Sequence, residues 1–300
     1  MAFGNGVEKV NNIKHVIITP SKNEENYIPT LIYSMINQTI KPVEWIIIDH
    51  GSTDNTSKII KEAMKKEKWI KYIYIESQEV RNRGAEIAKL FSIGMEGIET
   101  DDWAYCSKID SDMILPEDYF EKIFLNFNNN QKIGILGGNC FIVSKMGKKK
   151  IEKVQSDHVR GGLKTYRKEC FQDIGGVLIV NGWDGLDEAS AQMKGWVTRS
   201  LKDLEVEHRR ETGKYRGKII NNYISGEYAY FMGYIFPYIF VRSLKQMLDR
   251  PYFIGGMFML LGFSKSKFFR MPVYHKTEVV YFLKKKQARR LGLNKLYRRE

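Results

Sequence analysis

Trp103-Ala-Tyr-Cys-Ser-Lys-Ile109 is a short apolar stretch that leads directly into Asp110-Ser111-Asp112. A stretch of this length and composition predicts a buried β-strand, so the two carboxylates stand where the strand ends. Open α/β sheets bind ligands at the carboxyl ends of their strands, where one or two carboxylates hold Mg²⁺ or Mn²⁺ together with substrate phosphates. The stretch therefore predicts an α/β sheet with a metal-diphosphate site at its edge.

The rest of the first half supports the same class of fold. Short apolar stretches alternate with amphipathic ones, as in a doubly wound α/β sheet with flanking helices. The expected strands are His15–Thr19, Val43–Ile48, Tyr72–Ile75, Trp103–Ile109, Ile133–Gly137 and Asp203–Glu207. The expected helices are Asn26–Asn37, Asp54–Lys66, Arg83–Met95, Pro116–Asn129 and one that begins after Gly182 and ends at Gly195.

Two segments differ in character from this alternation. Residues Phe141–Glu169 are rich in lysine and predict a mobile basic loop near the site. From about Tyr223 onward, aromatic and basic residues predict a helical appendage. We therefore expect a catalytic domain over residues 1–222 and a helical C-terminal region over residues 223–300.

Composition sets limits on the class of protein. The chain has 300 residues, of which 43% are hydrophobic, enough to bury a full core. Cys106, Cys140 and Cys170 have no paired spacing and are expected to be buried thiols in a reducing compartment. Neither a signal peptide nor a transmembrane helix is expected, so the predicted location is cytoplasmic, with a peripheral position on the cytoplasmic face of a membrane as a further option.

The net charge of +13 is concentrated near the C-terminus. Residues Ser264–Glu300 contain twelve Lys or Arg against two Glu. Such an excess suits an anionic partner, either a membrane surface, a nucleic acid or a phosphorylated substrate, and also fits a solvated basic helix. A nucleic-acid-binding protein is the weaker hypothesis, because the carboxylates at the strand ends repel phosphate and no nucleic-acid-binding motif is present. No nucleic-acid partner is expected.

Three motifs occur in the order of a known family. They are Ile17-Ile-Thr-Pro20-Ser-Lys-Asn-Glu24-Glu25, Ile46-Ile-Ile-Asp49-His-Gly-Ser-Thr-Asp54 and Asp110-Ser-Asp112. Together they resemble the GT-A domain of family 2 glycosyltransferases over about Val16–Arg210. The resemblance implies metal-dependent, inverting transfer of a sugar from a nucleotide-diphospho-sugar donor, UDP- or GDP-linked, to a glycan, glycolipid or polysaccharide acceptor. Two other hypotheses are a nucleotidyltransferase, although the acidic Asn23-Glu24-Glu25 loop argues against it, and an inactive GT-A scaffold subunit.

The resemblance also implies roles for individual residues at the donor site. Pro20 and Glu24 would line the nucleoside pocket, Asp49 would accept a hydrogen bond from the base, and Arg83 would face the diphosphate or ribose. Mn²⁺ or Mg²⁺ would be held by Asp112, with Asp110 facing the ribose or the metal, and His208 reaching the metal or diphosphate. Three of these residues also have structural alternatives: Glu24 as a helix N-terminal charge, Arg83 as a surface cation, and His208 as a packed imidazole.

Inversion requires a carboxylate that takes the proton of the acceptor hydroxyl. Trp183-Asp184-Gly-Leu-Asp187-Glu188 offers three candidates. The family's acidic pair lies about three turns before a glycine, so counting back from Gly195 aligns Asp184 with the catalytic base. Asp187 and Glu188 remain alternatives, although helix-dipole stabilisation alone would explain acids in a first turn.

The stretch from Tyr228 to Phe263 is rich in Tyr, Phe, Met and Gly and contains Arg242, Lys245 and Arg250. Two interpretations stay open. Aromatic residues beside cations suit the surface of an anionic membrane that carries a lipid-linked acceptor. The same aromatics would also suit the core of a helical bundle.

Overall fold

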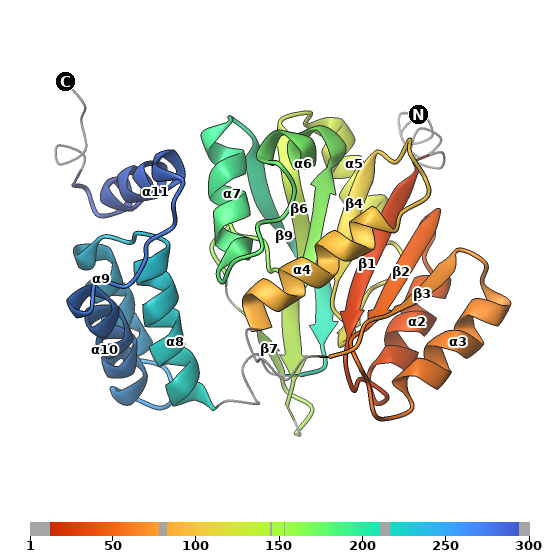
Figure 1. The fold of residues 1–300 in the computed structure, drawn as a ribbon, viewed down its shortest axis with the longest axis horizontal. Helices are drawn as coiled ribbons and strands as arrows, with labels where there is room; N and C mark the ends of the chain where they lie inside the picture. Colours follow the sequence, from red (N-terminus) through yellow and green to blue (C-terminus); the bar gives the residue numbers. More distant parts are fainter. Residues whose placement is uncertain (1–12, 78–82, 145, 153, 211–216, 294–300) are drawn as a thin grey trace. The chain divides into compact units, whose positions relative to one another are not determined.

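A computed structural model describes residues 13–77, 83–144, 146–152, 154–210 and 217–293 (Figure 1). The chain divides into two compact units, residues 1–210 and residues 211–300. Helix α8 begins at Lys218, so the expected boundary between residues 222 and 223 lies inside this helix.

The first unit is a mixed sheet between two layers of helices. Its strands are β1 (His15–Ser21), β2 (Glu44–Asp49), β3 (Ile70–Tyr74), β4 (Tyr105–Ile109), β5 (Met113–Ile114), β6 (Ile133–Val143), β7 (Lys149–Ile151), β8 (Leu163–Arg167) and β9 (Val197–His208). Its helices are α2 (Ile28–Ile36), α3 (Thr56–Lys66), α4 (Arg83–Glu96), α5 (Tyr119–Asn129), α6 (Lys168–Ile174) and α7 (Trp183–Met193).

The strand order is β3-β2-β1-β4-β8-β6-β9-β5, with β7 paired to β6. Strands β1 to β4 are parallel, whereas β8 runs antiparallel to both β4 and β6. The carboxyl ends of β1, β2 and β4 therefore meet at one edge, as the sequence predicts for the site.

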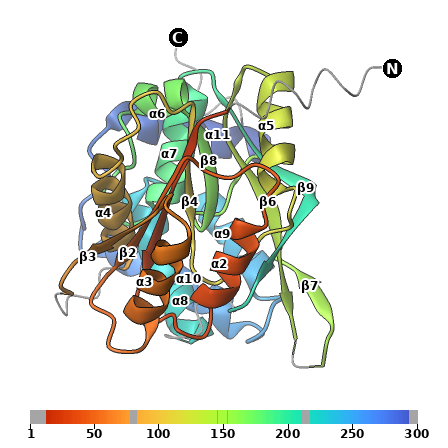
Figure 2. The same ribbon diagram turned by 90° about the vertical axis from the view of Figure 1, so that its right-hand side faces the viewer.

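Strand residues alternate between two cores, which explains the layers. Ile17 and Ile47 pack with α2, α3 and α5, whereas Ile18 and Ile48 pack with α4, α6 and α7. Figures 1 and 2 show α4 and α7 on one face of the sheet and α2 and α3 on the other. Apolar side chains on both faces are typical of strands covered by helices on both sides, so the predicted doubly wound α/β class is confirmed.

The prediction of a mobile loop over Phe141–Glu169 is wrong. The structure places β8 here, in the middle of the sheet between β4 and β6. The strand was missed because Leu163-Lys-Thr-Tyr-Arg167 is largely polar, although all five residues are buried. Strand β9 is also longer than the predicted Asp203–Glu207, because its exposed polar residues hide the earlier part of the strand.

The secondary structure assigned to the described residues of the second unit is entirely helical. It consists of α8 (Lys218–Phe231), α9 (Phe236–Gln246), α10 (Ile254–Phe268) and α11 (Thr277–Arg290). A small core forms around Ala229, Ile239, Met259 and Phe263. None of the described helices combines the length and the hydropathy needed to cross a bilayer.

Candidate functional site

The turn after β4 carries two of the predicted carboxylates and is fixed by its neighbours. The Asp110 amide donates to the Gly162 carbonyl at 3.0 Å, and the Ser111 hydroxyl donates to the Pro20 carbonyl at 3.3 Å. A Cβ on Gly162 would overlap the Asp110 carboxylate, so only glycine allows this close approach. The turn therefore lies between the end of β1 and the segment that enters β8.

Asp112 belongs to a charged cluster that joins four distant parts of the sequence. Arg210 Nη2 lies 2.7 Å from Glu24 Oε1 and 2.9 Å from Asp112 Oδ2. His208 Nε2 lies 3.5 Å from Asp112 Oδ2, and its Nδ1 lies 2.9 Å from Glu152 Oε2. The cluster thus brings together three predicted site residues, Glu24, Asp112 and His208.

The protonation of this cluster follows from burial and charge. Burial raises the pKa of Glu24 to about 7, although the Arg210 guanidinium opposes the shift. Burial alone would lower the pKa of His208, but its hydrogen bonds to Asp112 and Glu152 raise that pKa to about 9. Burial alone would raise the pKa of Asp112, but His208 and Arg210 hold it below its ordinary value. Asp112 is therefore an anion and His208 a cation at neutral pH.

Asp49 lies at the end of β2 in a separate polar group. It accepts hydrogen bonds from the Ser52 amide at 2.9 Å, the Tyr72 hydroxyl at 2.9 Å and the Ser57 hydroxyl. Burial alone would raise the pKa of Asp49, but these hydrogen bonds lower it. Arg83 is the first residue of α4, and its side chain lies outside the described part of the chain.

The three acids of α7 differ sharply in environment. Asp187 and Glu188 are buried, and Lys164 Nζ lies 2.8 Å from Asp187 Oδ1 and 3.1 Å from Glu188 Oε1. The Tyr166 hydroxyl donates to Asp187, and His158 Nδ1 lies 2.9 Å from Glu188 Oε2. Burial raises the pKa of Asp187 to about 6, against the opposing charge of Lys164.

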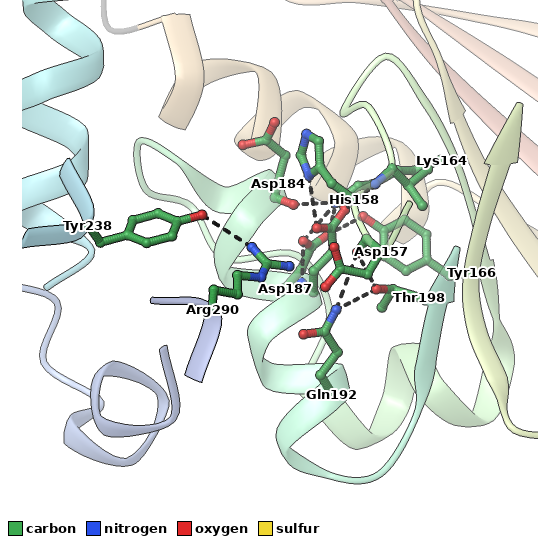
Figure 3. A network of polar contacts seen from close by, with 12 residues as sticks. Asp157, His158, Lys164, Tyr166, Asp184, Asp187, Gln192, Thr198, Tyr238 and Arg290 are labelled. Carbon is green, nitrogen blue, oxygen red and sulfur yellow. Dashed lines mark hydrogen bonds and ion pairs between the residues drawn. The ribbon is translucent and has the colours of Figure 1, made fainter. Parts of the chain in front are cut away.

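Asp184 is only partly buried, and its backbone carbonyl accepts a hydrogen bond from Lys164 Nζ. Figure 3 shows the Asp184 carboxylate turned away from the acids gathered around Lys164. Of the three candidates, Asp184 is thus the one that is partly exposed.

Trp183 and the Gly161-Gly162 pair connect the α7 acids with the turn after β4. The Lys108 and Lys164 ammonium groups lie 5.8 and 5.4 Å from the Trp183 ring centroid, and Lys108 also pairs with Asp110. A Cβ on Gly161 would lie 3.1 Å from the Trp183 ring and 3.2 Å from the Asp184 Cβ. Adjacent glycines therefore contact Asp110 on one side and Asp184 on the other.

Sequence reasoning missed the residues that organise this arrangement: Lys108, Glu152, His158, Lys164 and Tyr166. A signal for two of them is present, because a lysine inside a short buried strand needs a charged partner. Lys108 in β4 and Lys164 in β8 are both almost fully buried.

The family emerges from a comparison with known proteins. The sequence profile of the family described as Glycosyl transferase family 2 matches residues 16–168, just over half of the chain. The chain belongs to this family. The predicted resemblance is thereby confirmed. The match ends before α7, so the three acids of this helix and His208 lie outside it.

The curated relatives of this glycosyltransferase are bacterial. The chain is 34% identical over 123 residues to an uncharacterized glycosyltransferase of Haemophilus influenzae, covering 41% of this chain and 45% of that protein. It is 29% identical over 171 residues to a poly-beta-1,6-N-acetyl-D-glucosamine synthase of Staphylococcus epidermidis, covering 51% and 39%. The chain spans less than half the length of these relatives.

Solved structures share the fold of the glycosyltransferase at low identity. The mannosyltransferase PcManGT from Pyrobaculum calidifontis, in complex with GDP-Man and Mn²⁺, superposes with a TM-score of 0.54 at 12% identity, over 95% of this chain and 84% of that one. S. aureus TarS 1-349 in complex with UDP-GlcNAc gives 0.54 at 14% identity, over 95% and 89%. These likenesses confirm the GT-A fold.

The predicted metal-binding side chains can be compared with the ligands that the expected cation prefers. Asp110, Asp112 and His208 supply two carboxylates and an imidazole, which Mn²⁺ accepts as ligands once His208 has released its proton. Among the described residues, no three His, Cys, Asp or Glu side chains converge into a ready-made cation site, and Asp112 is instead paired with His208 and Arg210. The chemistry of the donor set fits a divalent metal, with substrate phosphates completing the shell.

Proposed function

We propose that this glycosyltransferase is metal-dependent and inverting, and that it transfers a sugar from a UDP- or GDP-linked donor to a glycan or lipid-linked acceptor. One observation carries the proposal. Gly161 lies against the Asp184 Cβ and the adjacent Gly162 lies against the Asp110 carboxylate, which supports a site that combines Asp184 with the carboxylates after β4. A donor at the strand ends would therefore present its sugar to a group that can accept a proton.

Asp184 is our candidate for the catalytic base. The acceptor oxygen would attack the anomeric carbon while the bond from that carbon to the diphosphate oxygen breaks, and the hydroxyl proton would pass to the Asp184 carboxylate. Asp187 and Glu188 are less suited to this role because Lys164 and His158 already neutralise them. Lys164 is instead a positioning residue, since it holds the Asp184 carbonyl and anchors the next turn of α7.

The donor would occupy the edge formed by β1, β2 and β4. Glu24 Oε2 is buried with no hydrogen-bond partner among the described residues, which leaves an acceptor for a nucleoside donor group. Pro20 and Asp49 lie at neighbouring strand ends, and Arg83 opens α4. These four residues remain our proposed nucleoside and diphosphate contacts.

Asp110, Asp112 and His208 would hold Mn²⁺ or Mg²⁺. When bound, the cation would neutralise charge on the departing diphosphate. The crystallised mannosyltransferase with GDP-Man and Mn²⁺ supports this assignment by fold alone. The cytoplasmic location and the choice between UDP and GDP stay predictions.

The donor site is tested by calorimetric titration with UDP and GDP, with and without Mn²⁺. We expect one nucleotide to bind only when Mn²⁺ is present, and Asp112→Ala to weaken this binding by at least about 100-fold. Asp203→Ala is the matched control, because Asp203 is an exposed aspartate on β9 and its loss should leave binding unchanged. Wild-type protein that binds neither nucleotide with metal present would contradict the proposal.

A further inference from the structure

The second unit leaves sixteen large apolar side chains exposed among its described residues. Its core is small, whereas in the first unit only six large apolar side chains among the described residues are exposed. The exposed large apolar residues of the second unit are Ile219, Ile220, Phe236, Phe240, Val241, Leu244, Leu248, Tyr252, Phe253, Ile254, Met257, Leu261, Phe268, Phe269, Met271 and Val273. Exposed apolar side chains in this number indicate an interaction site.

Two helices carry this surface as stripes. On α9, Phe236, Phe240 and Leu244 recur every four residues and are 48%, 43% and 45% exposed. On α10, Met257 and Leu261 also lie four residues apart and are 48% and 49% exposed. Residues four apart share one face of a helix, so each helix presents an apolar face outward.

Glycines lie where helices α8, α9 and α10 approach one another most closely. A Cβ on Gly226 of α8 would overlap the Met259 carbonyl of α10, and a Cβ on Gly262 of α10 would overlap the Tyr223 carbonyl of α8. A Cβ on Gly256 of α10 would likewise overlap the Ser243 carbonyl of α9. Large residues outward and glycines at backbone contacts are typical of helices whose surroundings are apolar.

The charge of the second unit indicates which kind of partner would cover its exposed apolar side chains. Residues 217–293 contain 13 Lys or Arg against three Asp or Glu, a net charge of +10. Cations also lie beside the apolar stripes, since Lys267 Nζ of α10 is 5.9 Å from the Phe236 ring centroid of α9. Apolar side chains next to cations suit the headgroup region of an anionic bilayer.

The lengths of the helices indicate how the unit would sit. α10, the longest described helix of the unit, has 15 residues. At about 1.5 Å per residue it is shorter than the hydrocarbon core of roughly 30 Å. We propose that the second unit docks on an anionic membrane surface, with the outward stripes of α9 and α10 inserted among the lipids and no helix crossing. This inference does not depend on the donor, the metal or the base proposed above.

The test uses the full chain and lipid vesicles in a sedimentation assay. Vesicles are made of phosphatidylcholine alone, or of phosphatidylcholine with about 30% phosphatidylserine, which supplies the negative charge of an anionic leaflet. We expect binding to the anionic vesicles at low salt that weakens as the salt concentration rises. Replacing Lys267 and Arg270 by Gln should reduce this binding by about fivefold per residue.

An apolar variant tests insertion directly. The triple substitution Phe240→Asn, Leu261→Asn and Phe268→Asn should weaken vesicle binding by at least about 100-fold, because each side chain would leave the lipid. All three residues are exposed, so the fold should be kept, and its circular dichroism melt checks this. The matched control is Tyr33→Asn, Val43→Asn and Met146→Asn, which replaces three exposed apolar residues of the first unit and should bind as wild type.

Three results would overturn the inference. The first is wild-type protein that does not bind anionic vesicles at low salt. The second is a triple variant that binds as tightly as the wild type. The third is light scattering that shows a wild-type dimer, a monomeric triple variant and no vesicle binding, which would assign the apolar face to a second copy of the chain.

Discussion

Replacing Lys164 by Met removes the cation that the buried acids of α7 share. Lys164 and Asp187 are both fully buried, and the ammonium group lies within 3.1 Å of Asp187 and Glu188. Removing one partner of a buried ion pair costs about 3–5 kcal/mol, because a charge remains in the interior. We expect Lys164→Met to lower the free energy of unfolding by this amount at pH 8.

The loss should depend on pH in a predictable direction. Burial already raises the pKa of Asp187 to about 6, and without Lys164 that pKa will rise further. A carboxyl group whose pKa is raised by folding destabilises the native state as the pH rises from the unfolded pKa to the raised one, and no further above it. As the pH falls from 8 to 6, the variant should therefore regain up to about 1.4 kcal/mol per pH unit relative to wild type once its native Asp187 takes up a proton.

Urea denaturation followed by tryptophan fluorescence measures this effect. The five tryptophans of the chain all lie between residues 45 and 196, so their fluorescence reports on the first unit. Lys149→Met is the matched control, because Lys149 forms an exposed pair with Glu205 and its loss should cost at most about 0.5 kcal/mol. If Lys164→Met does not fold, the double variant with Asp187→Asn should recover stability, because residue 187 then carries no charge that needs the missing ammonium group. A loss below about 1 kcal/mol at pH 8, or the same loss at pH 6, would refute the reasoning.

Three further predictions concern the base, the metal and the helical unit. Asp184→Asn should lower kcat by about 10²–10⁴-fold while nucleotide binding by calorimetry stays unchanged; a kcat near that of wild type would exclude Asp184 as the base. Chelation with EDTA should reduce release of the nucleoside diphosphate by at least about 100-fold, and Mn²⁺ should restore it in the wild type but not in Asp112→Ala. Gly262→Ala should destabilise the second unit by about 1–3 kcal/mol in a circular dichroism melt, since the new methyl group meets the Tyr223 carbonyl, whereas Ser264→Ala on the exposed side of α10 should be neutral.

The parallel part of the sheet could be predicted from the sequence because its strands are apolar on both faces. Val16-Ile-Ile18 and Ile46-Ile-Ile48 supply side chains to both cores, so they stand out as short apolar stretches. Strand β8 could not be found in this way, because Lys164, Thr165 and Arg167 are polar and become buried only through partners elsewhere in the chain. Arg167, for example, donates to the backbone carbonyls of Phe127 and Ile133.

The three acids of α7 could not be assigned separate roles from the sequence pattern alone. Asp184, Asp187 and Glu188 are spaced i, i+3 and i+4 and so share one face of the helix, so their spacing does not separate them and only the family resemblance favours Asp184. The separation comes from Lys164, a residue 23 positions before Asp187 that reaches the helix only because β8 lies in the sheet beneath it. A carboxylate held by a buried ammonium group already has its charge neutralised, whereas a carboxylate beyond its reach keeps its charge for an incoming proton. The lysine that pairs with Asp187 is therefore also the reason for our proposal that Asp184 is the base.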